Sequence, residues 1–206
     1  MKQPSLSAVH RKAARNLEDS LRQYEQAPSD VAREFLDLKL QATIFQYDVC
    51  AEMLNFTRNK PTGFAASVAL KGLVLRLYEY DDLMNTSFIP RLIALAGRRG
   101  IPFDRASVKA ARSQWKHDLA RLKKWSTFRN QVAGHYGKDL RMQVNLLKEL
   151  QPDEVMSVTK AFLSFNMALL QGLRDAGQGV ASGASQETPP KSLMQAEFSR
   201  RWVGQA

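Results

Sequence analysis

Apolar side chains recur at intervals of three and four residues along most of this chain, the spacing that gathers them on one face of an α-helix. The pattern is clearest over residues 30–58 and predicts a long helix there. Its stripe consists of Val31, Phe35, Leu38, Ala42, Phe45 and Val49, and it is widened by Leu36, Leu40, Ile44 and Tyr47. We therefore expect this helix to be covered on more than one side.

The same spacing predicts helices at residues 13–26, 63–82, 87–98, 105–133 and from Pro152 onwards, with a short helix at 138–149. The apolar positions that mark three of them are Leu17, Leu21 and Tyr24; Phe64, Val68, Leu73, Val74, Leu77 and Tyr78; and Val155, Val158, Phe162, Phe165 and Leu169. Residues that favour a helix start stand before or at four of these segments: Ser29-Asp30, Asn85-Thr86-Ser87, Asp104 and Pro152.

The fold class follows from these patterns, because no stretch alternates apolar and polar residues as a half-buried strand does. We predict an all-α fold: an antiparallel four-helix bundle with one or two additional short helices, formed by residues 1–176. Residues 1–12 are expected to be loose. From Gly177 the helical pattern is lost in a run rich in Gly, Ser and Pro. Residues 177–206 are therefore predicted to be a flexible C-terminal tail.

Composition narrows the kind of partner. The formal charge is +10 and the pI is near 9.9, a balance that favours polyanions and above all nucleic acid. No apolar run is long enough to span a membrane. The chain has one cysteine and three widely spaced histidines, so we expect no disulfide, no metal site and no cofactor. These features are typical of a protein of the reducing cytoplasm.

Positive charge is concentrated on the segment predicted as one helix over residues 105–133. Its basic side chains are Arg105, Lys109, Arg112, Lys116, Arg121, Lys123, Lys124 and Arg129. Lys123 and Lys124 stand directly before Trp125, and cations beside an aromatic ring suit single-stranded RNA through phosphate contact and base stacking. A helix interface explains Trp125 equally well. The candidate RNA-binding residues are Lys116, Arg121, Lys123, Lys124, Trp125 and Tyr136.

The stretch from Arg129 to Gly137 carries the groups best suited to chemistry. His135 can exchange a proton near neutral pH, Arg129 can bind a phosphate in bidentate fashion, and Asn130 can orient either partner. Such a set is sufficient for RNA cleavage in which the 2′-hydroxyl attacks the adjacent phosphodiester. The alternative is a helix C-terminus at which Arg and His merely lie near the negative end of the helix dipole.

Geometry limits how Arg129 and His135 can act together. Six residues of an α-helix advance by about 600°, so the two side chains would lie about 120° apart on an unbroken helix. They can meet if Gly134 ends the helix and lets His135 turn round. Otherwise two copies of the stretch must meet across a two-fold axis, where each patch contacts its own twin.

One motif resembles that of the HEPN superfamily in its RN-x(4)-H form. It consists of Arg129-Asn130 and His135, and it follows a long predicted helix in an all-α chain. That superfamily comprises helical ribonucleases and RNA-binding modules of toxin–antitoxin, abortive-infection and CRISPR systems. Two upstream segments, residues 75–82 and 86–93, are similar to the corresponding part of its abortive-infection branch. Asp81 and Asp82 lie in the first of these segments, where they can accept from Arg129 or from a backbone N–H, or form a solvated helix end.

The resemblance implies a function. Arg129 and His135 would be the catalytic pair, Asn130 would support them, and two chains would form a homodimer whose cleft binds RNA without a metal. The chain would be a toxin or phage-defence effector with a possible antitoxin partner. The chain departs from a related branch of the superfamily, whose motif is Arg-x(4)-His-x-Tyr. Here five residues separate Arg129 from His135, and Tyr136 follows His135 directly. We therefore interpret Tyr136 as a packing or base-stacking residue. The alternative function is a non-catalytic helical module that binds RNA or a protein.

Overall fold

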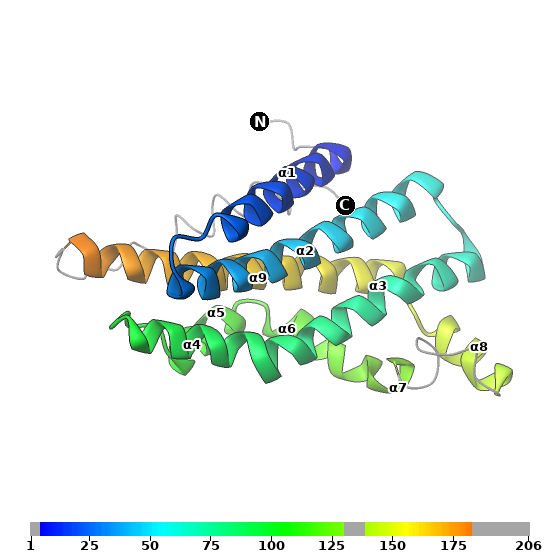
Figure 1. Cartoon of the computed structure of the whole chain (residues 1–206). Coiled ribbons are helices and arrows are strands. Elements are labelled where there is room, and N and C mark those ends of the chain that lie inside the picture. Colours follow the sequence, from blue (N-terminus) through cyan, green and yellow to red (C-terminus); the bar gives the residue numbers. More distant parts are fainter. Residues whose placement is uncertain (1–4, 130–138, 183–206) are drawn as a thin grey trace.

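The computed structural model describes residues 5–129 and 139–182. Within these two ranges the regular structure is entirely helical and includes no strand, so the predicted all-α class is confirmed. In Figure 1 the helices α1, α3, α4 and α9 run in one direction, whereas α2 and the segment from α5 to α7 run in the opposite one. The third of the four long helices predicted for the bundle is divided into short segments, and the arrangement as a four-helix bundle stays a prediction.

The first two helices pack against each other. Helix α1 spans Leu6–Glu25 and begins after Ser5, whose hydroxyl accepts from the N–H of Ala8. The prediction that residues 1–12 are loose is therefore wrong from Leu6 onwards. Helix α2 spans Asp30–Asn59 and is capped by Ser29, as predicted. Its predicted stripe is confirmed at Leu38, Ala42, Phe45 and Val49, which are buried, whereas the side chain of Val31 is outside the description.

The core forms where α2, α3 (Gly63–Leu83) and α9 (Pro152–Ser182) meet. The ring of Phe45 stacks on that of Tyr80 with centroids 3.8 Å apart, and Phe162 packs edge-on against both. The predicted stripe of α9 is buried at every position, but the stripe of α3 is not. Phe64 and Val68 are 45% and 47% exposed, because the start of α3 extends beyond the helices that cover its centre.

Helix α3 continues without a break into α4 (Ile89–Arg98) through a π-helical turn, η1 (Met84–Phe88). The prediction that Asn85, Thr86 and Ser87 cap a separate helix is wrong. Asn85 and Thr86 instead donate to the carbonyls of Asp81 and Asp82. The ring of Pro90 would clash with the carbonyl four residues earlier in a regular α-helix, which favours the wider turn. The predicted end of α4 is confirmed by Gly100, whose φ is +64°.

The predicted helix over residues 105–133 is divided into α5 (Arg105–Ser113), α6 (Lys116–Leu119), a 3₁₀ segment η2 (Ala120–Trp125) and α7 (Ser126–Phe128). Asp104 caps α5 as predicted and forms a reciprocal capping box with Ser107. The first break lies at Trp115, whose backbone is non-helical and whose ring packs against Phe165 with centroids 6.5 Å apart. This tertiary contact outweighs the local preference for a continuous helix.

The last two helices are α8 (Leu140–Lys148) and α9. Helix α8 begins at the capping residue Asp139, which accepts from the N–H of Met142, and it confirms the short helix predicted at 138–149. Helix α9 begins at Pro152 as predicted but continues to Ser182. The predicted tail therefore starts inside a helix at Gly177, and its remainder, residues 183–206, lies outside the described residues.

Candidate functional site

The predicted catalytic stretch lies at the edge of the described chain. Arg129 follows α7 directly, in helical geometry and with an exposed side chain. Asn130, His135 and Tyr136 lie outside the described residues. The predicted geometry between Arg129 and His135 therefore stays a prediction, whereas the segment that leads into it can be described residue by residue.

The segment that precedes Arg129 is anchored by four buried side chains at intervals of three: Leu119, Leu122, Trp125 and Phe128. A 3₁₀ helix has three residues per turn, so side chains at this interval lie in one row. The row faces the core, which explains why η2 replaces the predicted α-helix. The regular interval of three is a signal in the sequence that an analysis based on the α-helical period misses.

Trp125 belongs to this buried row and is only 6% exposed. Its ring is therefore covered by the core and offers no face to a nucleic-acid base. The interpretation of Trp125 as a helix-interface residue is correct, and its interpretation as an RNA-stacking residue is not supported. The buried ring instead fixes the position of the two lysines that precede it.

Most cations of the segment point into solvent. Exposed side chains in the described part are Arg105, Lys109, Lys116, Lys123, Lys124 and Arg129. In a 3₁₀ helix the side chains of Lys123 and Ser126 lie in one row, because three residues complete a turn. From Ser126 to Arg129 the chain is α-helical, and three residues advance about 300°, so Arg129 lies about 60° from that row. Lys123 and Arg129 thus lie on one exposed side, next to the start of the catalytic stretch.

Two cations of the segment are half-buried and hold it to the rest of the fold. The Nη2 of Arg112 lies 3.0 Å from Oδ1 of Asp81, and its guanidinium lies over the ring of Phe165 at 5.4 Å. Arg121 pairs with Glu154 at 3.4 Å and with Asp118 at 3.7 Å. Both arginines are half-buried, so Arg112 and Arg121 are bound to the protein's own carboxylates rather than displayed for a ligand.

Asp118 has a further partner that sequence analysis missed. Its Oδ1 accepts from the hydroxyl of Ser157 at 2.8 Å, which joins α6 to the first turns of α9. Together with the pair between Arg121 and Glu154, this bond fixes α6 and η2 on α9. No sequence signal links these residues, because they are separated by more than thirty positions along the chain.

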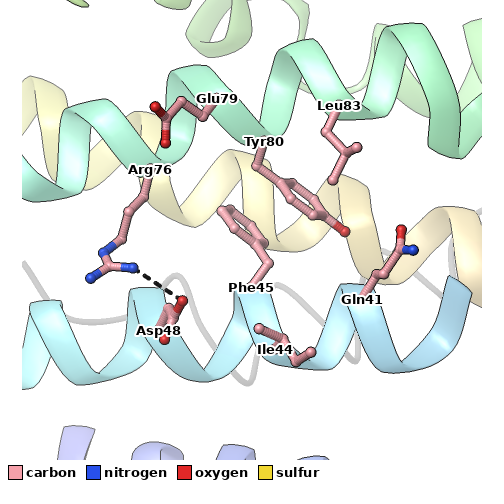
Figure 2. Close-up of a pocket in the computed structure, with 8 residues that line it drawn as sticks. All are labelled: Gln41, Ile44, Phe45, Asp48, Arg76, Glu79, Tyr80 and Leu83. Atoms are coloured by element: carbon pink, nitrogen blue, oxygen red, sulfur yellow. Dashed lines mark hydrogen bonds and ion pairs between the residues drawn. The ribbon is translucent and has the colours of Figure 1, made fainter. Parts of the chain in front are cut away.

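The upstream segment at residues 75–82 has structural contacts of its own. Arg76 donates to Asp48 at 3.1 Å and lies 3.4 Å from Glu52, and Figure 2 shows this pair at one end of a groove between α2 and α3. Tyr80 forms the floor of the groove, and its hydroxyl donates to Asn166 at 3.3 Å. Burial raises the pKa of Tyr80 far above its ordinary value, so the phenol remains neutral. Asp81, predicted to accept from Arg129 or a backbone N–H or to lie at a solvated helix end, accepts from Arg112 instead.

The groove in Figure 2 encloses about 290 Å³ and combines apolar and polar groups. Ile44 and Leu83 line its rim and are exposed, and Gln41 lies at its far end. The amide of Gln41 donates to Asp37 at 3.2 Å. No cation of the 105–129 segment lines this groove. The side chains of residues 75–82 that line it therefore join α3 to α2 rather than extend the basic surface.

Cofactor chemistry has few candidate groups in the described ranges. No cluster of three or more His, Cys, Asp or Glu side chains at metal-binding distance occurs among residues 5–129 and 139–182. Cys50 is buried in α2, as expected for a small apolar residue, and burial raises its pKa to about 11. Among the described helices, none is both long and apolar enough to cross a membrane.

Comparison with known proteins adds no relative: no protein-family model, no curated protein and no solved structure matches this chain.

Proposed function

We propose that this chain is a HEPN-like endoribonuclease that needs no metal ion and acts as a toxin or phage-defence effector. The observation that supports it best is the display of Lys123, Lys124 and Arg129 on a surface segment whose buried row fixes it to the core. This segment leads directly into the stretch that contains Asn130 and His135. The confirmed all-α class agrees with the resemblance.

The proposed reaction is an internal transesterification of RNA. His135 takes the proton of a ribose 2′-hydroxyl, and the 2′-oxygen attacks the adjacent phosphorus. The bond from phosphorus to the 5′-oxygen breaks, that oxygen takes up a proton, and the products are a 2′,3′-cyclic phosphate and a 5′-hydroxyl. Arg129 stabilises the negative charge that develops on the phosphoryl oxygens, and Asn130 orients the imidazole or the phosphate. Lys116, Lys123 and Lys124 hold the flanking phosphates.

The proposal includes a homodimer formed through the Arg129–His135 region. Its support is helical geometry: on an unbroken helix the two side chains lie about 120° apart, so unless Gly134 ends the helix a second copy must supply one of them. An exposed Arg129 at the end of α7 is accessible to such a second copy. An antitoxin protein that covers the same surface is a further possible partner of a toxin of this kind.

The test uses the purified full chain with radiolabelled single-stranded RNA in EDTA. We expect cleavage to 2′,3′-cyclic phosphate ends, and a loss of at least about 100-fold on His135→Ala or Arg129→Ala. His117→Ala is the matched control, since His117 is an exposed histidine of the same basic segment and should leave the rate unchanged. Cleavage by His135→Ala at the wild-type rate would show that another group, or a contaminant, is responsible.

The alternative function is a non-catalytic module that binds RNA. The exposure of the lysines favours this reading as much as it favours catalysis, because phosphate contact requires no turnover. In that case RNA would be retained intact. Replacing Lys123 and Lys124 by Ala would lower the slope of log K against log salt by about 1.4, since each phosphate contact on a single strand contributes about 0.7.

A further inference from the structure

A cavity of about 250 Å³ lies between α1, α2 and α9, and none of its lining residues belongs to the 105–129 segment. One wall is apolar and is formed by Phe35, Met167 and Leu170. The rest of the lining is polar and comes from all three helices: Asn16, Asp19, Ser20 and Gln23; Lys39, Thr43 and Gln46; and Gln171 and Arg174. The lining is more polar than that of most small-ligand sites, but convergent polar groups beside an apolar wall can still orient a small polar ligand.

Two cations converge on this cavity. Lys39 is half-buried in α2, and its pKa is lowered, first by desolvation and then by the positive charge of Arg174 on α9. The Nζ of Lys39 donates to Oε1 of Gln23 at 2.7 Å, a neutral partner that adds no compensating charge. Lys39 and Arg174 repel each other, although water partly screens the exposed Arg174, and an anion between them would relieve this repulsion.

The carboxylate in the lining does not fully neutralise this pair. Asp19 attracts Lys39, but its Oδ1 accepts a hydrogen bond from Arg22 at 2.8 Å on the outer surface of α1. Within residues 5–129 and 139–182 no carboxylate lies within ion-pair distance of Lys39 or Arg174. The cavity therefore carries an excess of positive charge.

A buried hydroxyl is the third element of the site. Ser20 lines the cavity and is 1% exposed, and its Oγ has no hydrogen-bond partner among the described residues. A serine within a helix usually donates to the carbonyl of the preceding turn, so an unpartnered buried hydroxyl is unusual and costs free energy. An acceptor atom inside the cavity would satisfy it.

We propose that this cavity binds a small anionic molecule with one phosphate or carboxylate group and a compact apolar body. The anionic group lies between Lys39 and Arg174 and accepts from Ser20, and the apolar body packs against Phe35, Met167 and Leu170. A guanidinium can bind either anion in bidentate fashion, so the cations alone do not choose between them. The volume favours a compact ligand, since drug-sized molecules occupy sites of about 300 Å³ or more. The site is independent of the proposed ribonuclease activity.

The test titrates the full chain with phenyl phosphate and, separately, with benzoate, by calorimetry and thermal denaturation in chloride buffer of constant ionic strength. We expect saturable binding of one compound in preference to the other, with a rise in melting temperature. Lys39→Met and Arg174→Gln should each weaken binding at least about tenfold, because each removes a charge-assisted contact. The compound preferred identifies the phosphate or the carboxylate class.

Two further variants keep the test decisive. Ser20→Ala removes no hydrogen bond of the free protein, so it should fold normally and bind several-fold more weakly. Arg33→Gln is the matched control, because Arg33 is an exposed cation of α2 outside the cavity, and its affinity should equal that of the wild type. The proposal is overturned if neither compound binds at millimolar concentration, or if Arg33→Gln weakens binding as much as Lys39→Met does.

Discussion

At the scale of the single residue, Cys50 shows how burial decides chemistry. It lies in the middle of α2 and is 1% exposed, and burial raises the pKa of its thiol to about 11. The thiolate is the reactive form of cysteine, and a thiol in an apolar environment rarely loses its proton. A nucleophilic or redox role for Cys50 therefore has no physical basis in the folded chain.

This burial predicts how Cys50 reacts with a thiol reagent. At pH 8 the folded chain should react far more slowly than the urea-unfolded chain, in a stopped-flow assay with an aromatic disulfide. Unfolding exposes a thiol with an ordinary pKa of about 8.5. The folded state holds the thiol proton of Cys50 more tightly than the unfolded state does, so this proton contributes to the free energy of unfolding. That contribution is complete below about pH 8.5 and is lost as the pH rises towards 11. Cys50→Ala should lack that alkaline loss.

At the scale of the element, the 3₁₀ segment η2 carries the candidate RNA surface. Its side chains divide into a buried row, which includes Leu122 and Trp125, and exposed rows that carry Lys123 and Lys124. Each buried anchor residue of η2 is therefore followed or preceded directly in the sequence by an exposed lysine. Stability and binding can be separated by substitutions at neighbouring residues.

Leu122→Ala should lower the free energy of unfolding by about 2–5 kcal/mol, since it removes a fully buried side chain from a packed core. Its neighbour Lys123→Ala should change the unfolding free energy by less than about 0.5 kcal/mol, because Lys123 is exposed. Urea denaturation followed by circular dichroism measures both. Equal effects of the two substitutions would mean that the buried row does not anchor η2 as described.

The sequence predicts a helix most accurately where its apolar residues keep one spacing along the whole helix. The stripe from Val155 to Leu169 and the cap at Ser29 are confirmed because each depends on local spacing or one hydrogen bond. The break at Trp115 was not predictable, since its cause is the ring of Phe165 on a distant helix. Likewise the exposure of Phe64 depends on where neighbouring helices end, which the helix's own sequence does not record.

At the scale of the whole molecule, α2, α3 and α9 are joined by polar as well as apolar contacts in the core. The hydroxyl of Tyr80 donates to Oδ1 of Asn166, and the amide of Asn166 donates to the carbonyl of Ala42 at 3.4 Å. Asn166 is 1% exposed, so both bonds lie within the core. One amide thus connects three helices that are far apart in the sequence.

Tyr80→Phe should lower the global unfolding free energy by about 1–2 kcal/mol, because it leaves the buried Oδ1 of Asn166 without its donor while the stacking on Phe45 is retained. Tyr78→Phe is the control, since the Tyr78 side chain is only half-buried on the same helix. Thermal denaturation at two probe wavelengths measures the change. A loss of stability in Tyr78→Phe of the same size would contradict the assignment.

The candidate site was predictable in part at this scale. Charge and residue type indicate which cations can meet RNA, and most of them are exposed. The roles of Arg112 and Arg121 were not predictable, because their carboxylate partners Asp81 and Glu154 come from other helices. The convergence of Lys39, Arg174 and Ser20 likewise depends on the packing of three helices and leaves no motif in the sequence.

The π-helical turn η1 has a consequence for the length of the chain. Tyr80, Met84, Phe88 and Leu92 are all buried at intervals of four, and over these twelve positions a regular α-helix would rotate by about 120° beyond whole turns. The wider turn absorbs this excess, so the helix contains one residue more than an α-helix with the same buried face would need. Loss of Asn85, Thr86 or Ser87 would leave Tyr80 and Leu92 within about 20° of each other. Elsewhere in α3 a one-residue deletion would rotate all that follows by about 100°, so η1 is the place in this helix where one residue can be lost while the buried face keeps its alignment.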